Sequence, residues 1–117
     1  MSEYMEQVKF MNYVRKKARE IPGLEAAHHI PNGGRRSKSE AHKFKLMGVV
    51  AGIPDINIPV ANKDYHGLFI EMKDGKGRAS KEQLNMKNII ENNGYCVKVC
   101  NGHEEAIYEL EEYLSKT

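Results

Sequence analysis

Two short runs of alternating side chains, joined by a polar turn, constrain the fold more than any other part of this chain. They lie within residues 52–73. In the register that buries the aliphatic side chains of both runs, Ile56 pairs with Ile70 and Ile58 pairs with Leu68. A slip of one residue would turn one aliphatic set toward water. The pattern therefore predicts an antiparallel β-hairpin.

The same register places two carboxylates side by side. Asp55 comes directly across from Glu71, with Cβ atoms roughly 5 Å apart, and Lys73 follows on the same face. Facing carboxylates repel each other unless a positive charge lies near them, and either Lys73 or a divalent cation can supply it. Hard oxygen ligands suit Mg²⁺ or Mn²⁺. Taken alone, the set is more typical of a structural ion-pair cluster on a solvated sheet face.

Length and composition restrict the class of protein. With 117 residues, 40% hydrophobic and 29% charged, the chain predicts one soluble globular domain over residues 1–117. Its net charge of +2 says little about partners. The sequence shows neither an apolar run of membrane-spanning length nor a signal-peptide pattern, so we expect a cytoplasmic protein. Cys96 and Cys100 lie too far apart along one predicted strand for a disulfide and are interpreted as small buried apolar residues.

The remaining patterns predict an α/β fold. Helices are expected from residue 2 to about 19, from 37 to 48, from 80 to about 93, and after Asn101. A weak strand is expected over 24–30 and a clear strand over 95–100. The order is helix, strand, helix, hairpin, helix, strand, helix. Because a helix links the hairpin to the last strand, that strand can return parallel to its neighbour. A mixed sheet with helices on both faces follows.

The helix starts carry typical capping residues. The expected N-caps are Ser2, Ser37, Ser80 and Asn101. In the second helix the spacing predicts that Ala41, Phe44 and Met47 face the core.

Positive charges gather around two loops that open helices. The first group is Arg35, Arg36, Lys38, Lys43 and Lys45, and the second is Lys76, Arg78 and Lys81. A basic loop at a helix N-terminus favours anions such as phosphate. Most charged runs are only a solvated face, and that interpretation also stays open.

Three further polar positions have structural as well as functional interpretations. Gln83 completes a capping box with Ser80, yet it lies one turn into the helix entered from the Glu-x-Lys strand. His28 and His29 precede a turn, where histidines are more often solvated or structurally satisfied.

The sequence segments around the two carboxylates resemble those of a known family. Pro54-Asp55, then Glu71-Met72-Lys73 on the next strand, is similar to the PD-(D/E)-x-K nuclease signature. The accompanying segments, in order, are Glu3 and Gln7, residues 29–33 (His-Ile-Pro-Asn-Gly), residues 48–55, residues 66–73, residues 77–83 and Gly94-Tyr95. This ordered set, from Glu3 to about Ile107, resembles a stand-alone VRR-NUC domain, the virus-type replication-repair nuclease family. Lys81 departs from the proline that the family often has there, a small change at the first position of a helix.

That resemblance implies a restriction-endonuclease-like fold and DNA hydrolysis that depends on Mg²⁺ or Mn²⁺. It implies that the carboxylates of Asp55 and Glu71 and the Met72 carbonyl bind the metal, that Lys73 acts on the nucleophilic water, and that Gln83 supports the site. Glu3 matches the first-helix acid of the family, with Glu6 as a rival. Short stand-alone members resemble Holliday-junction resolvases and are homodimers, which act in bacterial or phage-infected cells.

The interpretation we favour is a metal-dependent, structure-selective endonuclease acting on branched DNA, four-way junctions or flaps. No helix resembles a base-reading element, which sequence specificity would require. Both cationic groups would then bind phosphates, with His29 and Asn32 lining the cleft. The alternatives are a DNA-binding module of the same fold without catalysis, and a nuclease acting on RNA or on another nucleic-acid structure.

Overall fold

The computed structural model describes residues 1–31 and 37–117. Its elements are α1 (Glu3–Lys17), the short 3₁₀ helix η1 (Leu24–Ala26), β1 (His28–His29), α2 (Lys38–Leu46), β2 (Ile56–Ile58), β3 (Leu68–Lys73), α3 (Lys81–Glu91), β4 (Cys96–Asn101) and α4 (His103–Leu114). The predicted order of helices and strands is confirmed. None of the described helices is both long and apolar enough to cross a lipid bilayer.

The strands form one mixed sheet in the order β1-β2-β3-β4. β1, β2 and β3 are antiparallel, whereas β4 runs parallel to β3 after the α3 crossover. The predicted hairpin register is confirmed, with Ile56 opposite Ile70 and Ile58 opposite Leu68. Both pairs are fully buried, as the alternation requires.

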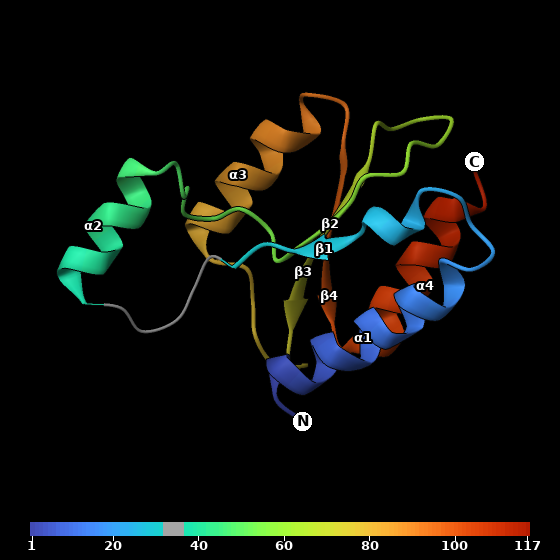
Figure 1. The fold of residues 1–117 in the computed structure, drawn as a ribbon, viewed down its shortest axis with the longest axis horizontal. Coiled ribbons are helices and arrows are strands. Elements are labelled where there is room, and N and C mark those ends of the chain that lie inside the picture. Colours follow the sequence, from blue (N-terminus) through green and yellow to red (C-terminus); the bar gives the residue numbers. More distant parts are fainter. Residues whose placement is uncertain (32–36) are drawn as a thin grey trace.

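Helices cover the two faces of the sheet unequally. α1 and α4 lie together on one side of the strands, and α3 lies on the other (Figure 1). The core forms on the first side, where Phe10, Val14 and Leu110 belong to the same buried cluster as the hairpin isoleucines. Cys96 and Cys100 are buried there as free thiols, and burial raises the pKa of Cys100 to about 12, as expected for structural residues.

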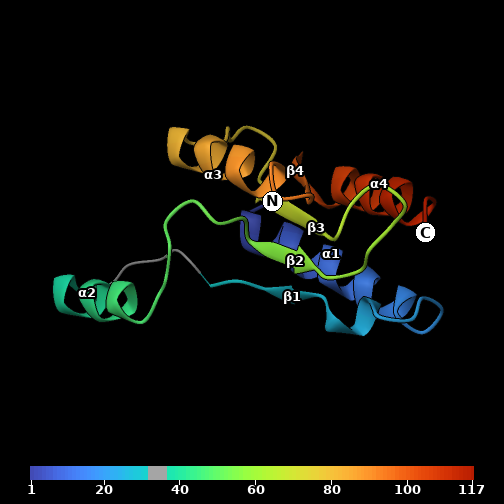
Figure 2. The same ribbon diagram turned by 90° about the horizontal axis from the view of Figure 1, so that it is seen from above.

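The α2 helix corrects one expectation. It stands apart from the sheet in both views (Figures 1 and 2), and none of its side chains is buried. Ala41 is exposed and Phe44 is only partly buried. Met47, just past the helix, is 79% exposed. The apolar spacing was therefore a poor guide here, because periodicity reports a helix but not what lies beside it.

Two element boundaries also differ from the expectation. The expected strand over residues 24–30 is divided into η1 and the two-residue β1. Asn101 ends β4 and does not cap α4; the N-cap is Gly102, which has no side chain to do so. The Glu6 carboxylate of α1 takes over this role, because its Oε1 accepts hydrogen bonds from the backbone N–H of His103, at 2.9 Å, and from His103 Nδ1, at 2.5 Å.

Candidate active site

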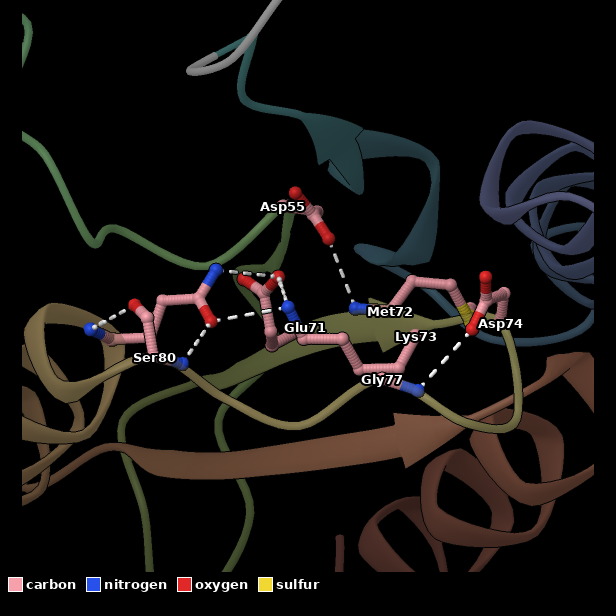
Figure 3. A network of polar contacts seen from close by, with 8 residues as sticks. Asp55, Glu71, Met72, Lys73, Asp74, Gly77 and Ser80 are labelled. Atoms are coloured by element: carbon pink, nitrogen blue, oxygen red, sulfur yellow. Dashed lines mark hydrogen bonds and ion pairs between the residues drawn. The ribbon is translucent and has the colours of Figure 1, made fainter.

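Asp55 stands at a bend immediately before β2, where the hairpin ladder has not yet begun. Its carboxylate Oδ2 accepts a hydrogen bond from the backbone N–H of Met72 at 2.9 Å (Figure 3). Its main-chain carbonyl accepts one from the backbone N–H of Ile30 at 2.6 Å. The bend thus lets the Asp55 side chain reach across to β3 beside Glu71, as the predicted register requires.

Glu71 is buried, with only 3% of its surface exposed, and its two carboxylate oxygens have different surroundings. Oε2 accepts a hydrogen bond from Gln83 Nε2 at 3.0 Å and lies 3.4 Å from Lys73 Nζ. Oε1 is buried without a hydrogen-bond partner among the described residues. A buried polar atom left in this state is costly unless something outside the chain satisfies it.

The electrostatics of Glu71 follow from this environment. Burial, and then the negative charge of Asp55, raise the pKa of Glu71 to about 7, while the Lys73 ammonium opposes the rise. Protonation or a bound cation would each relieve the repulsion between the two carboxylates.

Gln83 joins the lysine and the glutamate. Its Oε1 accepts hydrogen bonds from Lys73 Nζ at 3.1 Å and from the backbone N–H of Ser80 at 2.8 Å, while its Nε2 donates to Glu71. The predicted capping box with Ser80 is present. Both interpretations of Gln83 are therefore realised together, because the loop after β3 brings the first turn of α3 back over the strand.

The residues present fit a divalent cation. The free Glu71 oxygen and the Asp55 carboxylate are hard ligands close together. The N–H and the carbonyl of a strand residue point toward the same neighbouring strand. Because the Met72 N–H donates a hydrogen bond to the Asp55 carboxylate, the Met72 carbonyl also points to the side of Asp55. No group of three or more His, Cys, Asp or Glu side chains within the described ranges could hold a metal, so a cation here would be held by two carboxylates with the Met72 carbonyl.

The two first-helix acids are separated by their contacts. Glu6 is used at the start of α4, and its hydrogen bonds from His103 lower its pKa. Glu3 is exposed and does not join Asp55 and Glu71 in a three-ligand group of described side chains. Glu3 stays a prediction as a metal ligand, and the geometry offers Glu6 less freedom for that role.

The predicted phosphate-binding cations fall into two places. Lys76, Arg78 and Lys81 are exposed in the loop and first turn that lead from Lys73 to Gln83. Lys38, Lys43 and Lys45 are exposed on the projecting α2. The remaining candidates, Asn32, Arg35 and Arg36, lie outside the described residues.

His29 lies between the segment that carries Asp55 and the helix α1, and its role in lining a DNA cleft stays a prediction. Its Nδ1 lies 2.9 Å from the Asp55 carbonyl oxygen and 2.9 Å from the Gln7 side-chain amide on α1. Sequence reasoning assigned Gln7 no role in the site, although its spacing one turn after Glu3 was a usable signal.

Gly52 is a second position whose role the sequence reasoning missed. Its φ is +88°, and a Cβ built on it would lie 2.7 Å from the carbonyl oxygen of Glu82 in α3. Only glycine allows this approach. It closes one side of a pocket of about 190 Å³ that Asp55 and Gln83 also line. The signal was present as the glycine of the Gly-Ile-Pro-Asp segment.

Comparison with known proteins agrees with this geometry. A family model described as the VRR-NUC domain matches residues 2–104. A solved structure described as a VRR_NUC domain protein is similar with a TM-score of 0.84 and 34% sequence identity, covering 99% of this chain and 90% of that one. No curated protein matches the chain. The restriction-endonuclease-like α/β fold expected from the sequence is confirmed.

Proposed function

The chain belongs to the VRR-NUC domain family, nucleases of the PD-(D/E)-x-K superfamily, and from this premise we propose that it is an endonuclease that uses Mg²⁺ or Mn²⁺ to hydrolyse phosphodiester bonds in branched DNA. The single observation that carries the proposal is the Glu71 carboxylate. One of its oxygens is tied to Gln83 and Lys73, and the other is buried without a described partner beside Asp55. A simple structural ion-pair cluster would satisfy both oxygens.

Each of these side chains has a separate role in the proposed hydrolysis. Asp55, Glu71 and the Met72 carbonyl would hold the cation, which supplies charge for the scissile phosphate and acidifies a water when bound. Lys73 Nζ, which donates a hydrogen bond to Gln83, would orient that water and offset negative charge in the transition state. Gln83 also keeps Glu71 from turning away.

The proposed substrate follows from the distribution of charge and the lack of a base-reading element. Phosphate contacts from Lys76, Arg78 and Lys81 beside the site, and from α2 further out, would hold the backbone of a duplex without reading its bases. A homodimer would place two such sites around a two-fold axis, which suits paired cuts in a branched substrate.

The proposal is tested by a cleavage panel over linear, flapped, forked and four-way DNA with Mg²⁺, Mn²⁺ or EDTA, with the oligomeric state measured in parallel. We expect cutting of branched DNA only with metal. Lys73→Ala should slow cutting by about 100-fold or more and leave DNA affinity within about threefold. Lys87→Ala is the matched control, because this ammonium on α3 pairs with Glu91 away from the carboxylates.

The outcomes separate the alternatives. DNA binding without metal-dependent cutting would support the non-catalytic module. Cutting of RNA in preference to DNA, or of linear DNA as fast as junctions, would contradict the proposed substrate class.

A further inference from the structure

The main chain of Asp55 depends on β1 for its position. The pairing of β2 with β3 begins at Ile56, one residue after Asp55. On the other edge of β2, the Asp55 carbonyl oxygen has two neighbours, the backbone N–H of Ile30 at 2.6 Å and His29 Nδ1 at 2.9 Å. Two donors match the two lone pairs of a carbonyl oxygen. β1 and the residue directly after it therefore hold the Asp55 backbone, through the side chain of His29 and the main chain of Ile30.

The chemistry of this contact defines where the His29 proton lies. A carbonyl oxygen can only accept, so Nδ1 must carry the hydrogen and donate it to Asp55. The Gln7 atom that lies 2.9 Å from the same nitrogen is Nε2, and an amide N–H at this place would need an Nδ1 that accepts. Amide oxygen and nitrogen are assigned from the hydrogen-bond network, and an Nδ1 that donates to Asp55 requires the reversed Gln7 amide, with Oε1 toward the ring. In this arrangement the Nδ1–H of His29 donates to the Asp55 carbonyl oxygen.

We propose that His29 is a positioning residue: through its Nδ1–H it holds the Asp55 main chain so that the carboxylate faces Glu71 and the shared cation. This inference rests on the proposed function, because it takes Asp55 as a metal ligand. It differs from the role expected from the sequence, where His29 lines the DNA cleft.

The need for such a contact comes from the shortness of β1. β1 is a two-residue edge strand, paired with β2 only through His28 opposite Asn57 and His29 opposite Ile56. A strand this short holds its neighbour weakly. A side-chain hydrogen bond to the residue that carries the ligand adds a restraint at the point where metal binding needs it, as outer contacts to metal ligands generally do.

The test measures Mn²⁺ binding by electron paramagnetic resonance, with no DNA present, on the full chain. We expect His29→Ala to weaken Mn²⁺ binding by about tenfold, within the range typical for lost outer contacts. His29→Asn should stay within about threefold of the wild type, because its amide nitrogen can occupy the place of Nδ1 and donate. His28→Ala is the matched control on the same strand, since the ring of His28 contacts the Ala26 carbonyl at 2.8 Å.

Two parallel readouts separate positioning from DNA contact. DNA affinity in EDTA should change by less than about twofold in His29→Ala, while single-turnover cleavage at saturating DNA slows and partly recovers at high Mn²⁺. Thermal unfolding without metal should give His29→Ala and His29→Asn midpoints close to that of His28→Ala.

Three results would overturn the inference. These are equal Mn²⁺ affinity in His29→Ala and His28→Ala, equal weakening in His29→Asn and His29→Ala, and loss of DNA affinity with Mn²⁺ binding intact. In each case the wild type still binds Mn²⁺ and cuts DNA, so the proposed function stands. A wild type that binds no Mn²⁺ and cuts nothing would overturn the proposed function itself, and the role of His29 with it.

Discussion

At the scale of one residue, Glu71 is a buried carboxylate whose hydrogen-bonding capacity the described residues use only in part. The side chain is buried beside a second carboxylate, with one oxygen satisfied and the other free among the described residues. A stability-optimised core would replace this group or surround both oxygens with donors. The site instead leaves one Glu71 oxygen available as an acceptor, which lowers the stability of the fold without metal.

The burial of Glu71 beside Asp55 predicts that the stability of the metal-free protein depends on pH. The pKa of Glu71 is raised from 4.5 to about 7 in the folded protein. Below pH 4.5 the carboxyl is protonated in both states, so its contribution to the stability of the folded state is fully present there. As pH rises toward 7, the unfolded chain ionises while the folded chain must ionise a buried group, and the contribution is lost, by roughly 3 kcal/mol at 1.36 kcal/mol per pH unit.

We expect Glu71→Gln to abolish that decline. Urea denaturation in EDTA between pH 4.5 and 8 measures it: the free energy of unfolding of the wild type should fall relative to Glu71→Gln by about 2–3 kcal/mol across this range. Glu82→Gln, an exposed change on α3, is the control and should follow the wild type. Parallel curves for Glu71→Gln and the wild type would contradict the buried, charge-repelled carboxylate.

At the scale of elements, the site depends on how closely α3 approaches the segment before β2. The first turn of α3 supplies Gln83, and the segment before β2 supplies Asp55. Gly52 sets their separation, because its missing side chain leaves room for the Glu82 carbonyl. The pairing of these two elements is thus a backbone contact, and its sequence requirement is a single glycine.

Gly52→Ala should therefore damage both stability and cleavage. The new Cβ would lie 2.7 Å from the Glu82 oxygen, and alanine is strained at φ +88°, so we expect a loss of about 1–3 kcal/mol in the free energy of unfolding. Gly48→Ala is a matched control on the same segment. It carries similar strain at φ +105° with nothing within 4 Å of the new atom.

Comparison of the two variants separates the effect of the close contact with the Glu82 carbonyl from the effect of backbone strain. Chemical denaturation should show Gly52→Ala as the less stable variant, and only Gly52→Ala should lose most of its cleavage. Equal stability and equal cleavage in the two glycine variants would mean that backbone strain alone matters at position 52.

At the scale of the whole molecule, α2 extends the positive surface beyond the compact body. None of its residues is buried, and the figures place it beyond α3, on the side of the sheet away from α1 and α4 (Figures 1 and 2). A nine-residue helix has little stability of its own in water. We expect its exposed lysines to contact a DNA backbone that extends past the proposed active site.

Removing these charges should change how DNA binding responds to salt. We expect the triple substitution of Lys38, Lys43 and Lys45 by alanine to weaken binding and to reduce the slope of log affinity against log salt by about 2–3. Fluorescence anisotropy between 50 and 200 mM salt measures this. The control replaces Lys9, Lys16 and Arg19, exposed cations of α1 and its C-terminal end, by alanine and removes the same net charge. A similar slope in the two triple variants would mean that α2 contributes only general charge.

The sequence by itself determined the hairpin and the chemistry that it carries. The aliphatic alternation around Ile56 and Ile70 allows one buried register, and that register already places Asp55 near Glu71 and Lys73. The capping serines were also readable, because an N-cap involves residues only three apart. Such features depend on near neighbours in the chain, and local geometry leaves few alternatives.

Tertiary structure alone decided which distant groups meet. Gln83 with Glu71, Glu6 with the start of α4, and His29 with Asp55 are contacts between different elements. The same is true of the position of α2, whose apolar spacing wrongly predicted a core face. A side chain's spacing shows which face of an element it occupies, but what covers that face depends on how the other elements pack, and a single short segment does not encode that.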